Sequence, residues 1–276
     1  AARAPAGGAR AAAAPPPAPA APAARRAPGG RLVYMGAGTS GRLGVLAATE
    51  CPPTFGTPPE MVLGVIAGGP PALTRAVEGA EDRPELAVTD LTGVGLGPRD
   101  VLVGIATSGR TPYVIAGLQH ARSLGCFTVG LACNENSALA PHADVVIAPC
   151  VGPEIVAGST RLKAGTATKM VLNMLTTGAM IRMGKTYGNL MVDLRATNTP
   201  VVLRGGGMVA SLVGVAEAEA ERLLAAADGE LKTAVVARLR GVSPAEARRL
   251  LAAAGGHLRR ALEGAAAAGG SGHGRS

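Results

Sequence analysis

The feature that most constrains the fold is an alternation of short apolar segments with longer helical ones between Arg31 and Met183. Short apolar runs predict five strands, at residues 31–35, 61–66, 101–105, 127–131 and 145–147. The remaining segments predict helices that start near Ser40 or span residues 71–77, 111–124 and 159–183. Strands that alternate with helices form right-handed βαβ units, so the sequence predicts an α/β fold with a doubly wound parallel sheet.

Composition agrees with a core built from aliphatic side chains. The 276 residues are 47% hydrophobic but only 2% aromatic, which suits a parallel sheet covered by helices. The four cysteines have no C-x-x-C spacing, and three lie in or beside apolar runs, so we expect free thiols and a reducing compartment. Neither a membrane span nor a signal peptide is expected, and the predicted location is cytoplasmic.

The net charge of +8 raises the question of nucleic-acid binding. Half of that excess lies in residues 1–30, which contain four arginines and no acid. The rest is scattered, and there are few aromatic side chains on which bases could stack. We therefore expect no nucleic-acid partner and no membrane partner, and an anionic small substrate accounts for the remaining charge.

Three segments differ in composition from the rest of the chain. Residues 1–30 contain only Ala, Pro, Gly and Arg, and residues 264–276 also lack an apolar face, so both are predicted to be disordered tails. Pro200 and three consecutive glycines predict a linker over residues 199–208, between an α/β domain at 31–198 and a helical module at 209–263. Three short helices are expected in that module, at about 216–226, 230–239 and 244–254.

The sharpest functional signal is the tetrapeptide Thr-Ser-Gly-Arg, which occurs at 39–42 after the first predicted strand and at 107–110 after the third. Each copy places hydroxyl groups in a turn that opens a helix, where free N–H groups and the positive dipole end bind phosphate. Helix capping explains either turn alone. Two such turns at the carboxyl ends of parallel strands predict a phosphate or sugar site.

The first turn also fits the dinucleotide pattern G-x-G-x-x-G, through Gly36, Gly38 and Gly41. That motif requires an acid at the end of the next strand, and residues 67–69 contain none. The nicotinamide interpretation is therefore the weaker one. Three histidines are isolated and the fourth lies in the C-terminal tail, so no metal site is expected.

Several acids and one lysine are further candidates. Glu50 lies between a helix end and a Pro-Pro pair, where burial would raise the pKa of its carboxyl group as a general acid requires. Three acids cluster over residues 76–82, although a solvated helix end explains any one of them. Lys163 lies in a Ser/Thr-rich segment, 158–166, that either completes an anion site or caps a helix.

These candidates lie in segments that resemble the N-acetylmuramic acid 6-phosphate etherases. The similarity spans residues 30–198, and its most specific segments are 34–44, 50–56, 76–82, 108–113, 158–166 and 188–193. The resemblance implies a sugar isomerase (SIS) domain, which is a flavodoxin-like doubly wound sheet, followed by a small three-helix module like a ubiquitin-associated (UBA) domain. It also implies a homodimeric, cofactor-free lyase of cell-wall sugar recycling that binds a small sugar phosphate.

The implied reaction removes lactate, which is held as an ether on C3 of a 6-phosphorylated amino sugar. A base takes the C2 proton of the open-chain sugar, an acid protonates the departing oxygen, and water then adds to the unsaturated product. D-lactate and N-acetylglucosamine 6-phosphate result, with Glu50 implied as the acid and Glu81 as the base. The residues implied in substrate binding are Gly38, Thr39, Ser40, Ser108, Gly109, Arg110, Thr111, Ser159 and Lys163.

Two other functions fit the same fold. The animal glucokinase regulatory protein shares the resemblance, so a sugar-phosphate sensor without turnover is one alternative. A SIS-type sugar-phosphate isomerase is the other, because it needs the same abstraction of the C2 proton. The presence of both Glu50 and Glu81 favours the lyase over the sensor, and the Glu-Cys-Pro-Pro string at residues 50–53 favours it over the isomerase.

Overall fold

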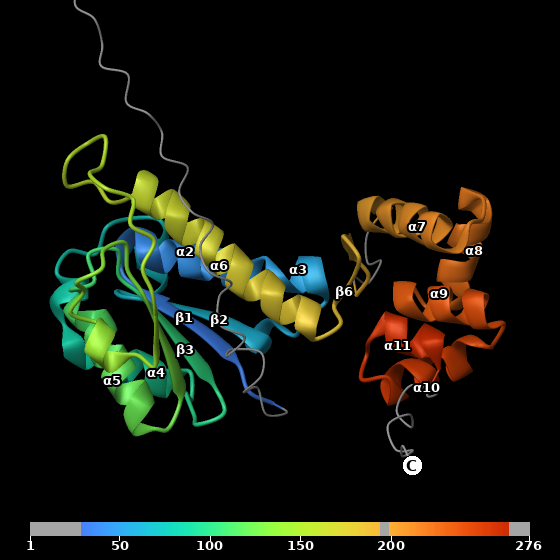
Figure 1. Ribbon diagram of the computed structural model, residues 1–276, viewed down its shortest axis with the longest axis horizontal. Coiled ribbons are helices and arrows are strands. Elements are labelled where there is room, and N and C mark those ends of the chain that lie inside the picture. The colour runs from blue at the N-terminus through green and yellow to red at the C-terminus, as the bar shows by residue number, and fades with distance from the viewer. Residues whose placement is uncertain (1–28, 194–198, 265–276) are drawn as a thin grey trace, which may run out of the picture.

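The computed structural model describes residues 29–193 and 199–264, and its first part is a five-stranded parallel sheet (Figure 1). The five predicted strands are confirmed, three of them with the predicted bounds. They are β1 (Leu32–Gly36), β2 (Val62–Ile66), β3 (Val101–Ile105), β4 (Phe127–Leu131) and β5 (Val145–Ile147). Apart from residues 29, 30 and 264, the two predicted tails lie outside the described residues.

The strand order β2-β1-β3-β4-β5 confirms the doubly wound fold. Because the order reverses between β1 and β3, the topological switch point lies at the carboxyl ends of these two strands. Gly36, the last residue of β1, is in register with Ile66 of β2 and Ile105 of β3, so the three strands end at one level. Every residue of β1 and β3 is buried, as parallel strands covered on both faces require.

Helices cover both faces of the sheet and build two apolar clusters (Figure 1). On one face lie α2 (Gly38–Thr49), α3 (Cys51–Phe55) and α6 (Lys163–Arg182); on the other lie α4 (Pro84–Gly93) and α5 (Pro112–Ser123). The cluster under α2 and α6 contains the buried side chains of Tyr34, Phe55 and Leu172, and the cluster under α4 and α5 contains Leu91 and Leu118. Aliphatic side chains therefore fill most of the core, as the composition predicts.

The predicted helix over residues 71–77 is wrong. The segment is a 3₁₀ turn, η2 (Pro70–Leu73), which begins after two glycines with φ of 83° and 67°. The glycines and the prolines that follow leave room for only one tight turn, closed by the bond from Ala72 N to the Gly69 carbonyl at 3.0 Å. Three further 3₁₀ turns were not predicted: η1 (Pro59–Met61), η3 (Ala80–Asp82) and η4 (Ala140–His142).

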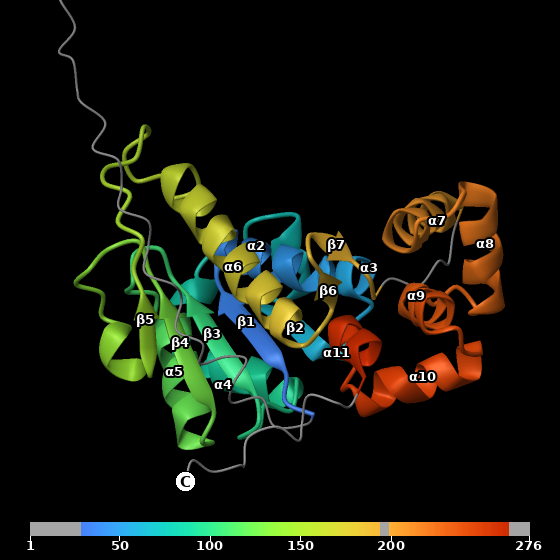
Figure 2. The same ribbon diagram turned by 45° about the vertical axis from the view of Figure 1, so that its right-hand side comes forward.

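A hairpin and a helical group follow the α/β unit, and Figure 2 shows the hairpin between the two. The hairpin strands are β6 (Thr186–Tyr187) and β7 (Leu190–Met191). The helices are α7 (Thr199–Val213), α8 (Glu217–Ala226), α9 (Leu231–Arg240), α10 (Pro244–Ala253) and α11 (Leu258–Glu263). The three predicted helices are confirmed as α8, α9 and α10, and α7 and α11 are additional. The UBA-like character and the domain division remain predictions.

Residues 199–208, for which the sequence predicts a linker, are helical and belong to α7. Three glycines in a helix cost about 1 kcal/mol each relative to alanine, which is why the sequence indicates a break. Tertiary packing outweighs that cost: Val209 is fully buried in an apolar cluster with Leu224 of α8 and Val236 of α9. Burial of the hydrophobic face of α7 therefore stabilises the helix by more than its glycines destabilise it.

Two further observations concern the cysteines and the helices. All four cysteines are free thiols, in agreement with the prediction, and burial raises the pKa of Cys51 and of Cys126 to about 11. Over the described ranges, none of the helices is both long and apolar enough to cross a membrane.

Candidate functional site

The two Thr-Ser-Gly-Arg turns meet at the switch point of the sheet. The hydroxyl oxygens Ser40 Oγ and Thr107 Oγ1 lie 3.4 Å apart, although 67 residues separate them in the chain. The first turn follows β1 and the second follows β3, so neighbouring strands carry them to the same edge. Ligands bind at this edge in open α/β sheets, so the structure places the predicted hydroxyl groups where a ligand site is expected.

The two copies of the tetrapeptide differ in local structure. Residues 39–42 lie inside the first turn of α2, whereas residues 107–111 form a non-helical turn and α5 begins only at Pro112. Proline favours the first helical position and disfavours helical geometry in the residue before it, which keeps Thr111 outside the helix. The expectation that both turns directly open a helix therefore holds for the first copy alone.

Close packing of α2 on β1 and β2 depends on small residues. A Cβ on Gly41 would lie 2.7 Å from the Gly36 carbonyl oxygen and 2.6 Å from Cγ1 of Ile66, and one on Gly36 would lie 2.8 Å from the Gly41 nitrogen. Gly38, at φ 51°, makes the turn between strand and helix. These glycines bring the amino end of α2 against the sheet, where its free N–H groups and dipole can act on an anion.

The second turn is held by residues that follow β4, which the sequence analysis did not single out. Asn134 donates its side-chain amide to the carbonyls of Ser108, at 2.8 Å, and Thr107, at 3.3 Å. Ser137 packs so closely on Gly109 that a Cβ there would lie 2.2 Å from the Ser137 Cβ, and Gly109 itself has φ 67°. The position of Asn134 and Ser137 at the end of a neighbouring strand was the signal that could have identified them.

The two arginines of the repeated tetrapeptide have different roles. Arg42 donates to the carbonyls of Leu73, at 3.2 Å, and Arg75, at 3.3 Å, so it holds the segment that follows β2. Arg110 is exposed, and its backbone N–H donates to the Ser108 hydroxyl at 3.3 Å. Arg110 is therefore the arginine whose guanidinium is open to an anion at the second turn.

The amino end of α6 approaches the first turn. A Cβ on Gly165 would lie 3.8 Å from Cγ2 of Thr39, so the two helix ends are neighbours. Glu154 accepts the N–H groups of Lys163, at 2.9 Å, and Ala164, at 3.1 Å. Although burial opposes the effect, these bonds hold the pKa of Glu154 below its ordinary value. The carboxylate of Glu154 thus occupies the position at the amino end of α6 in which an external anion would bind.

The predicted contacts Lys163 and Ser159 are placed near this helix end. Lys163 is the first residue of α6, and its ammonium group donates to the Pro153 carbonyl at 2.8 Å. Ser159 is half-buried in the loop before α6, and its backbone N–H donates to the Val156 carbonyl at 3.0 Å. Lys163 therefore begins α6, and Ser159 lies in the loop just before it.

Glu81 is exposed on η3, which lies between β2 and α4. Its neighbour Ala80 is buried in the same apolar cluster as Ala106 and Tyr113, which flank the second hydroxyl turn. The backbone of η3 also packs against α5, while the Glu81 carboxyl group faces solvent. The role of Glu81 in catalysis stays a prediction.

Glu50 lies elsewhere, and the expectation that it is buried is wrong. Its side chain is exposed where α2 ends and α3 begins, because the two prolines after it start α3 and turn the chain away. Thr39 and Glu50 are close to opposite ends of α2, about 16 Å apart at 1.5 Å per residue. Within one chain, the structure therefore does not bring Glu50 together with the hydroxyl turns.

The described residues do not form the ligand set of a metal site or of a dinucleotide site. Over the part of the chain that the structure describes, no three His, Cys, Asp or Glu side chains lie together as a metal site requires. At the end of β2, where a dinucleotide site needs an acid, residues 67–69 are Ala-Gly-Gly. The groups that converge at the switch point are hydroxyls and helix N–H groups, which suit a phosphate ester.

A doubly wound sheet with two hydroxyl turns at its switch point is the arrangement of a SIS-domain protein. Two family models match this part of the chain: the glucokinase regulatory protein N-terminal SIS domain over residues 21–122, and the SIS domain over residues 94–178. A curated relative that is 70% identical and is matched over 68% of its length shows that the chain belongs, more narrowly, to the N-acetylmuramic acid 6-phosphate etherase family.

Membership of that family rests on curated relatives. The chain is 70% identical over 207 residues to the N-acetylmuramic acid 6-phosphate etherase of Rhodopirellula baltica, covering 75% of this chain and 68% of that protein. It is 60% identical over 208 residues to the etherase of Brucella anthropi, with the same coverage. Among solved structures, an E. coli CFT073 protein in complex with A5P has a TM-score of 0.42 and 17% identity, over 55% of this chain and 70% of that one.

Proposed function

We propose that this chain is a lyase that cleaves the lactyl ether of N-acetylmuramic acid 6-phosphate, giving N-acetylglucosamine 6-phosphate and D-lactate. The observation that carries the proposal is the meeting of the Ser40 and Thr107 hydroxyls at the switch point, in a chain of the etherase family. The proposed setting is recycling of cell-wall amino sugars in the cytoplasm.

The 6-phosphate binds at the hydroxyl turns. Ser40 and Thr39 stand at the amino end of α2, where the helix dipole and free N–H groups favour a dianion. Ser108 and Thr111 add hydroxyl donors from the second turn, and the exposed guanidinium of Arg110 adds a positive charge. Gly38 and Gly109 allow the backbone to approach the phosphate oxygens, because neither carries a side chain.

The reaction proceeds by elimination and then hydration. Glu81 removes the C2 proton of the open-chain sugar, the C2–H electron pair forms the C2=C3 double bond, and the C3–O bond breaks. Glu50 delivers a proton to the departing lactate oxygen. Water then adds across the double bond, with its oxygen on C3 and a proton on C2. A positioned carboxyl group is worth about 10²- to 10⁴-fold in the rate of such proton transfers.

Binding without turnover is a second candidate, which the match to the glucokinase regulatory protein model favours. A sensor would need the hydroxyl turns but neither carboxylate. Measurement of lactate distinguishes the two candidates. The sugar phosphate would stabilise a sensor against heat, but a sensor would release no lactate.

The test is incubation of the folded chain with N-acetylmuramic acid 6-phosphate, followed by measurement of D-lactate. Glu81→Gln removes the proposed base at constant shape, so lactate release should fall by about 10²- to 10⁴-fold while substrate still raises the melting temperature. The matched control is Glu85→Gln, because Glu85 is an exposed acid that pairs with Arg83 at 2.8 Å on α4. Its rate should match the wild type. No lactate from the wild-type chain would refute the etherase, and an unchanged rate in Glu81→Gln would remove Glu81 from the mechanism.

A further inference from the structure

A cavity of about 530 Å³ lies where the α/β unit meets the helical group. Met61 and Met183 belong to its wall on the first side, and residues of α9 and α10 form the wall on the other. Met61 directly precedes β2 and Met183 directly follows α6, so the cavity lies at the edge of the sheet opposite the hydroxyl turns. Its volume is that of a small-molecule site, and the proposed reaction does not use it.

Close packing fixes the two sides of this cavity. A Cβ on Gly56, which ends α3, would overlap the carbonyl oxygen of Asp193 after the hairpin. A Cβ on Gly184, just after α6, would lie 2.7 Å from Cγ of His257, the residue before α11. Backbone therefore approaches the hairpin at one contact and the helical group at the other, and the cavity between them has preformed walls, as is usual for a ligand site.

Two lysines on the cavity wall share one carboxylate. Lys185, in the segment after α6, and Lys232, on α9, both pair with Asp193, the second at 3.0 Å. Lys232 also donates to the Gly256 carbonyl at 2.7 Å. Each ammonium group has three N–H donors, so the contacts among the described residues leave donors for a further acceptor. The two lysines carry one positive charge more than Asp193 balances.

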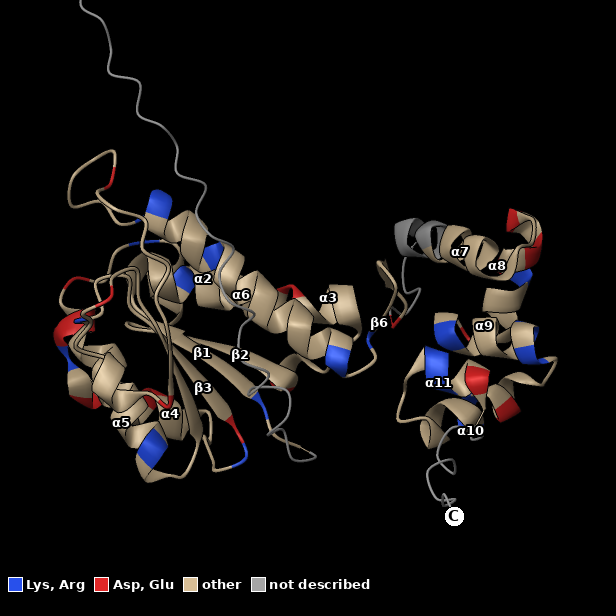
Figure 3. Cartoon of the chain, in the orientation of Figure 1, with Lys and Arg blue, Asp and Glu red and all other residues tan. Residues whose placement is uncertain are grey.

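The surplus charge lies at the lysines and not elsewhere on the described wall. Burial lowers the pKa of Lys232 and Lys185 lowers it further, although Asp193 opposes both effects. The other charged groups that line the cavity are Arg248 and Glu230, which pair with each other at 2.8 Å. Arg248 also pairs with an exposed acid, at position 228, so its charge is already balanced. Figure 3 shows blue segments at the end of α6 and on α9, on the two sides of the junction.

Much of the remaining wall is apolar. The apolar side chains that line the cavity are Met61, Met183, Val192, Leu231, Leu251 and Ala252. A singly charged carboxylate with a hydrocarbon body matches both this surface and the single surplus charge. A phosphate monoester would bring a second negative charge towards Asp193 and Glu230, and a metal cation would face the two ammonium groups.

From the cavity, its apolar wall and its paired lysines, we infer that the junction is a binding site for a small carboxylic acid. The carboxylate lies against Lys185 and Lys232, and the hydrocarbon body packs on the side chains of α9, α10 and the end of α6. Because one lysine belongs to each side of the junction, the ligand joins the helical group to the α/β unit. This site is separate from the hydroxyl turns and does not depend on the proposed lyase function.

Calorimetric titration of the whole wild-type chain with a matched set of six-carbon probes tests the inference. Hexanoate supplies the carboxylate and the hydrocarbon body, and this small ligand should bind with a Kd of about 1 mM or lower. Hexan-1-ol keeps the body without the charge and hexyl phosphate adds a second charge, so each should bind at least about tenfold more weakly. Absence of hexanoate binding at about 10 mM would overturn the inference, and so would equal or tighter binding of either other probe.

Variants near the end of α6 locate the site. Lys185→Gln removes one of the two positive charges, so hexanoate should bind at least about tenfold more weakly, whereas Lys185→Arg keeps the charge and should retain binding. The matched control is Arg182→Gln, which removes the same charge from an exposed position of α6 outside the cavity wall and should bind as the wild type does. Thermal unfolding first shows that each variant is folded. Equal affinity of Lys185→Gln and the wild type would overturn the inference.

Hydrogen exchange measured by mass spectrometry supplies an independent result. Hexanoate should slow exchange in α9, in α10 and in the segment after α6, because it binds the folded junction. Exchange at residues 39–42 and 107–110 should stay unchanged, and slower exchange there with none at the junction would place hexanoate at the hydroxyl turns and contradict the inference. None of these measurements needs turnover, so their outcome is distinct from that of the lactate assay.

Discussion

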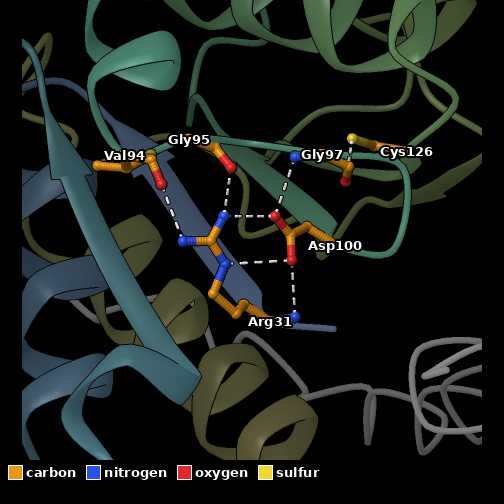
Figure 4. A network of polar contacts seen from close by, with 6 residues as sticks. All are labelled: Arg31, Val94, Gly95, Gly97, Asp100 and Cys126. Carbon is orange, nitrogen blue, oxygen red and sulfur yellow. Dashed lines mark hydrogen bonds and ion pairs between the residues drawn. The ribbon is translucent and has the colours of Figure 1, made fainter. Parts of the chain in front are cut away.

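At the scale of single residues, Asp100 joins the amino ends of β1 and β3 (Figure 4). Its carboxylate is 5% exposed and accepts hydrogen bonds from the backbone N–H of Arg31, at 2.8 Å, and of Gly97, at 3.0 Å. The guanidinium of Arg31 pairs with the same carboxylate at 2.6 Å and donates to the carbonyls of Val94 and Gly95. Because this network lies at the edge of the sheet opposite the hydroxyl turns, its role is stability.

The first prediction concerns Asp100→Asn. Loss of a nearly buried carboxylate that accepts a charged donor should lower the free energy of unfolding at pH 7 by about 2–3 kcal/mol, measured by urea denaturation. Glu85→Gln, which breaks an exposed ion pair, should cost less than about 1 kcal/mol. Equal stability of Asp100→Asn and the wild type would contradict the network.

The same variant has a predictable pH dependence. Burial opposes the shift, but the bonds from Arg31 and Gly97 hold the pKa of Asp100 below its ordinary value of 3.8. A folded-state pKa below the unfolded one gives stability that is complete above pH 3.8 and is lost as the pH falls through the folded-state value. The difference between wild type and Asp100→Asn should therefore be constant from pH 7 to about pH 5 and shrink below about pH 4.

At the scale of elements, α2 is the helix on which the site depends. Its amino end carries the first hydroxyl turn, its carboxyl end leads to Glu50, and its glycines set the distance to the sheet. Ser40 is buried because Gly41, next to it, lets the helix approach β1 and β2 closely. A change in this packing moves the Ser40 hydroxyl away from Thr107, so the geometry of the site and the packing of α2 are linked.

The second stability prediction is Gly41→Ala. The new Cβ would meet the Gly36 carbonyl oxygen at 2.7 Å, and backbone must shift to relieve that contact, so unfolding free energy should fall by about 1–3 kcal/mol. Gly207→Ala is the control, because Gly207 is an exposed helical position of α7 with no neighbour within 4 Å of the new Cβ. It should gain up to about 1 kcal/mol from helix propensity. The free energy of unfolding of both variants is measured by thermal and urea denaturation. An increase for Gly41→Ala would contradict the close packing of α2 on the sheet.

At the scale of the whole molecule, the β6–β7 hairpin joins the α/β unit to the helical group. Tyr187 and Leu190 of the hairpin pack against the apolar cluster of the helices, and the Arg259 guanidinium lies 5.5 Å from the centre of the Tyr187 ring. Lys232 of α9 is buried, pairs with Asp193 at 3.0 Å and donates to the Gly256 carbonyl at 2.7 Å. Apolar packing and this buried ion pair together hold the helices to the hairpin.

The third stability prediction is Lys232→Met. Methionine keeps most of the side-chain volume but removes the bonds to Asp193 and Gly256, so the helical group should lose about 1–3 kcal/mol of stability. Hydrogen exchange measured by mass spectrometry should rise in α9 to α11 while the strands stay protected. The control is Arg249→Met, because Arg249 forms an exposed pair with Glu246 and should change exchange little. A uniform rise across the sheet would contradict the assignment of Lys232 to the junction.

Much of the fold was predictable because local patterns are strong in this chain. All five strands are short apolar runs, and α10 begins at Pro244 after the cap Ser243, as predicted. The predictions that differ from the structure also concern short segments. Residues 71–77 were predicted to be a helix although two glycines and two prolines precede or open the segment. The helical structure of residues 199–208, for which the sequence predicts a linker, was also missed, and this helix packs on α8.

The candidate site was only partly predictable. The repeated tetrapeptide indicated the edge of the sheet, and the Ser40–Thr107 contact confirms that its two copies meet. The different local structure of the two copies and the exposure of Glu50 could not be predicted. These features depend on contacts between residues that are far apart in the sequence and on the surroundings of each helix end.

The sequence by itself determined the strands, the α/β class and the hydroxyl turns, because these follow from residue type and spacing over a few neighbouring positions. The tertiary structure alone decided that Ser40 lies against Thr107, that α7 is helical through its glycines, and that Glu50 stands at the far end of α2. The reason is physical: burial and long-range packing outweigh local propensities of about 1 kcal/mol, and distances between side chains exist only once the helices are seated on the sheet.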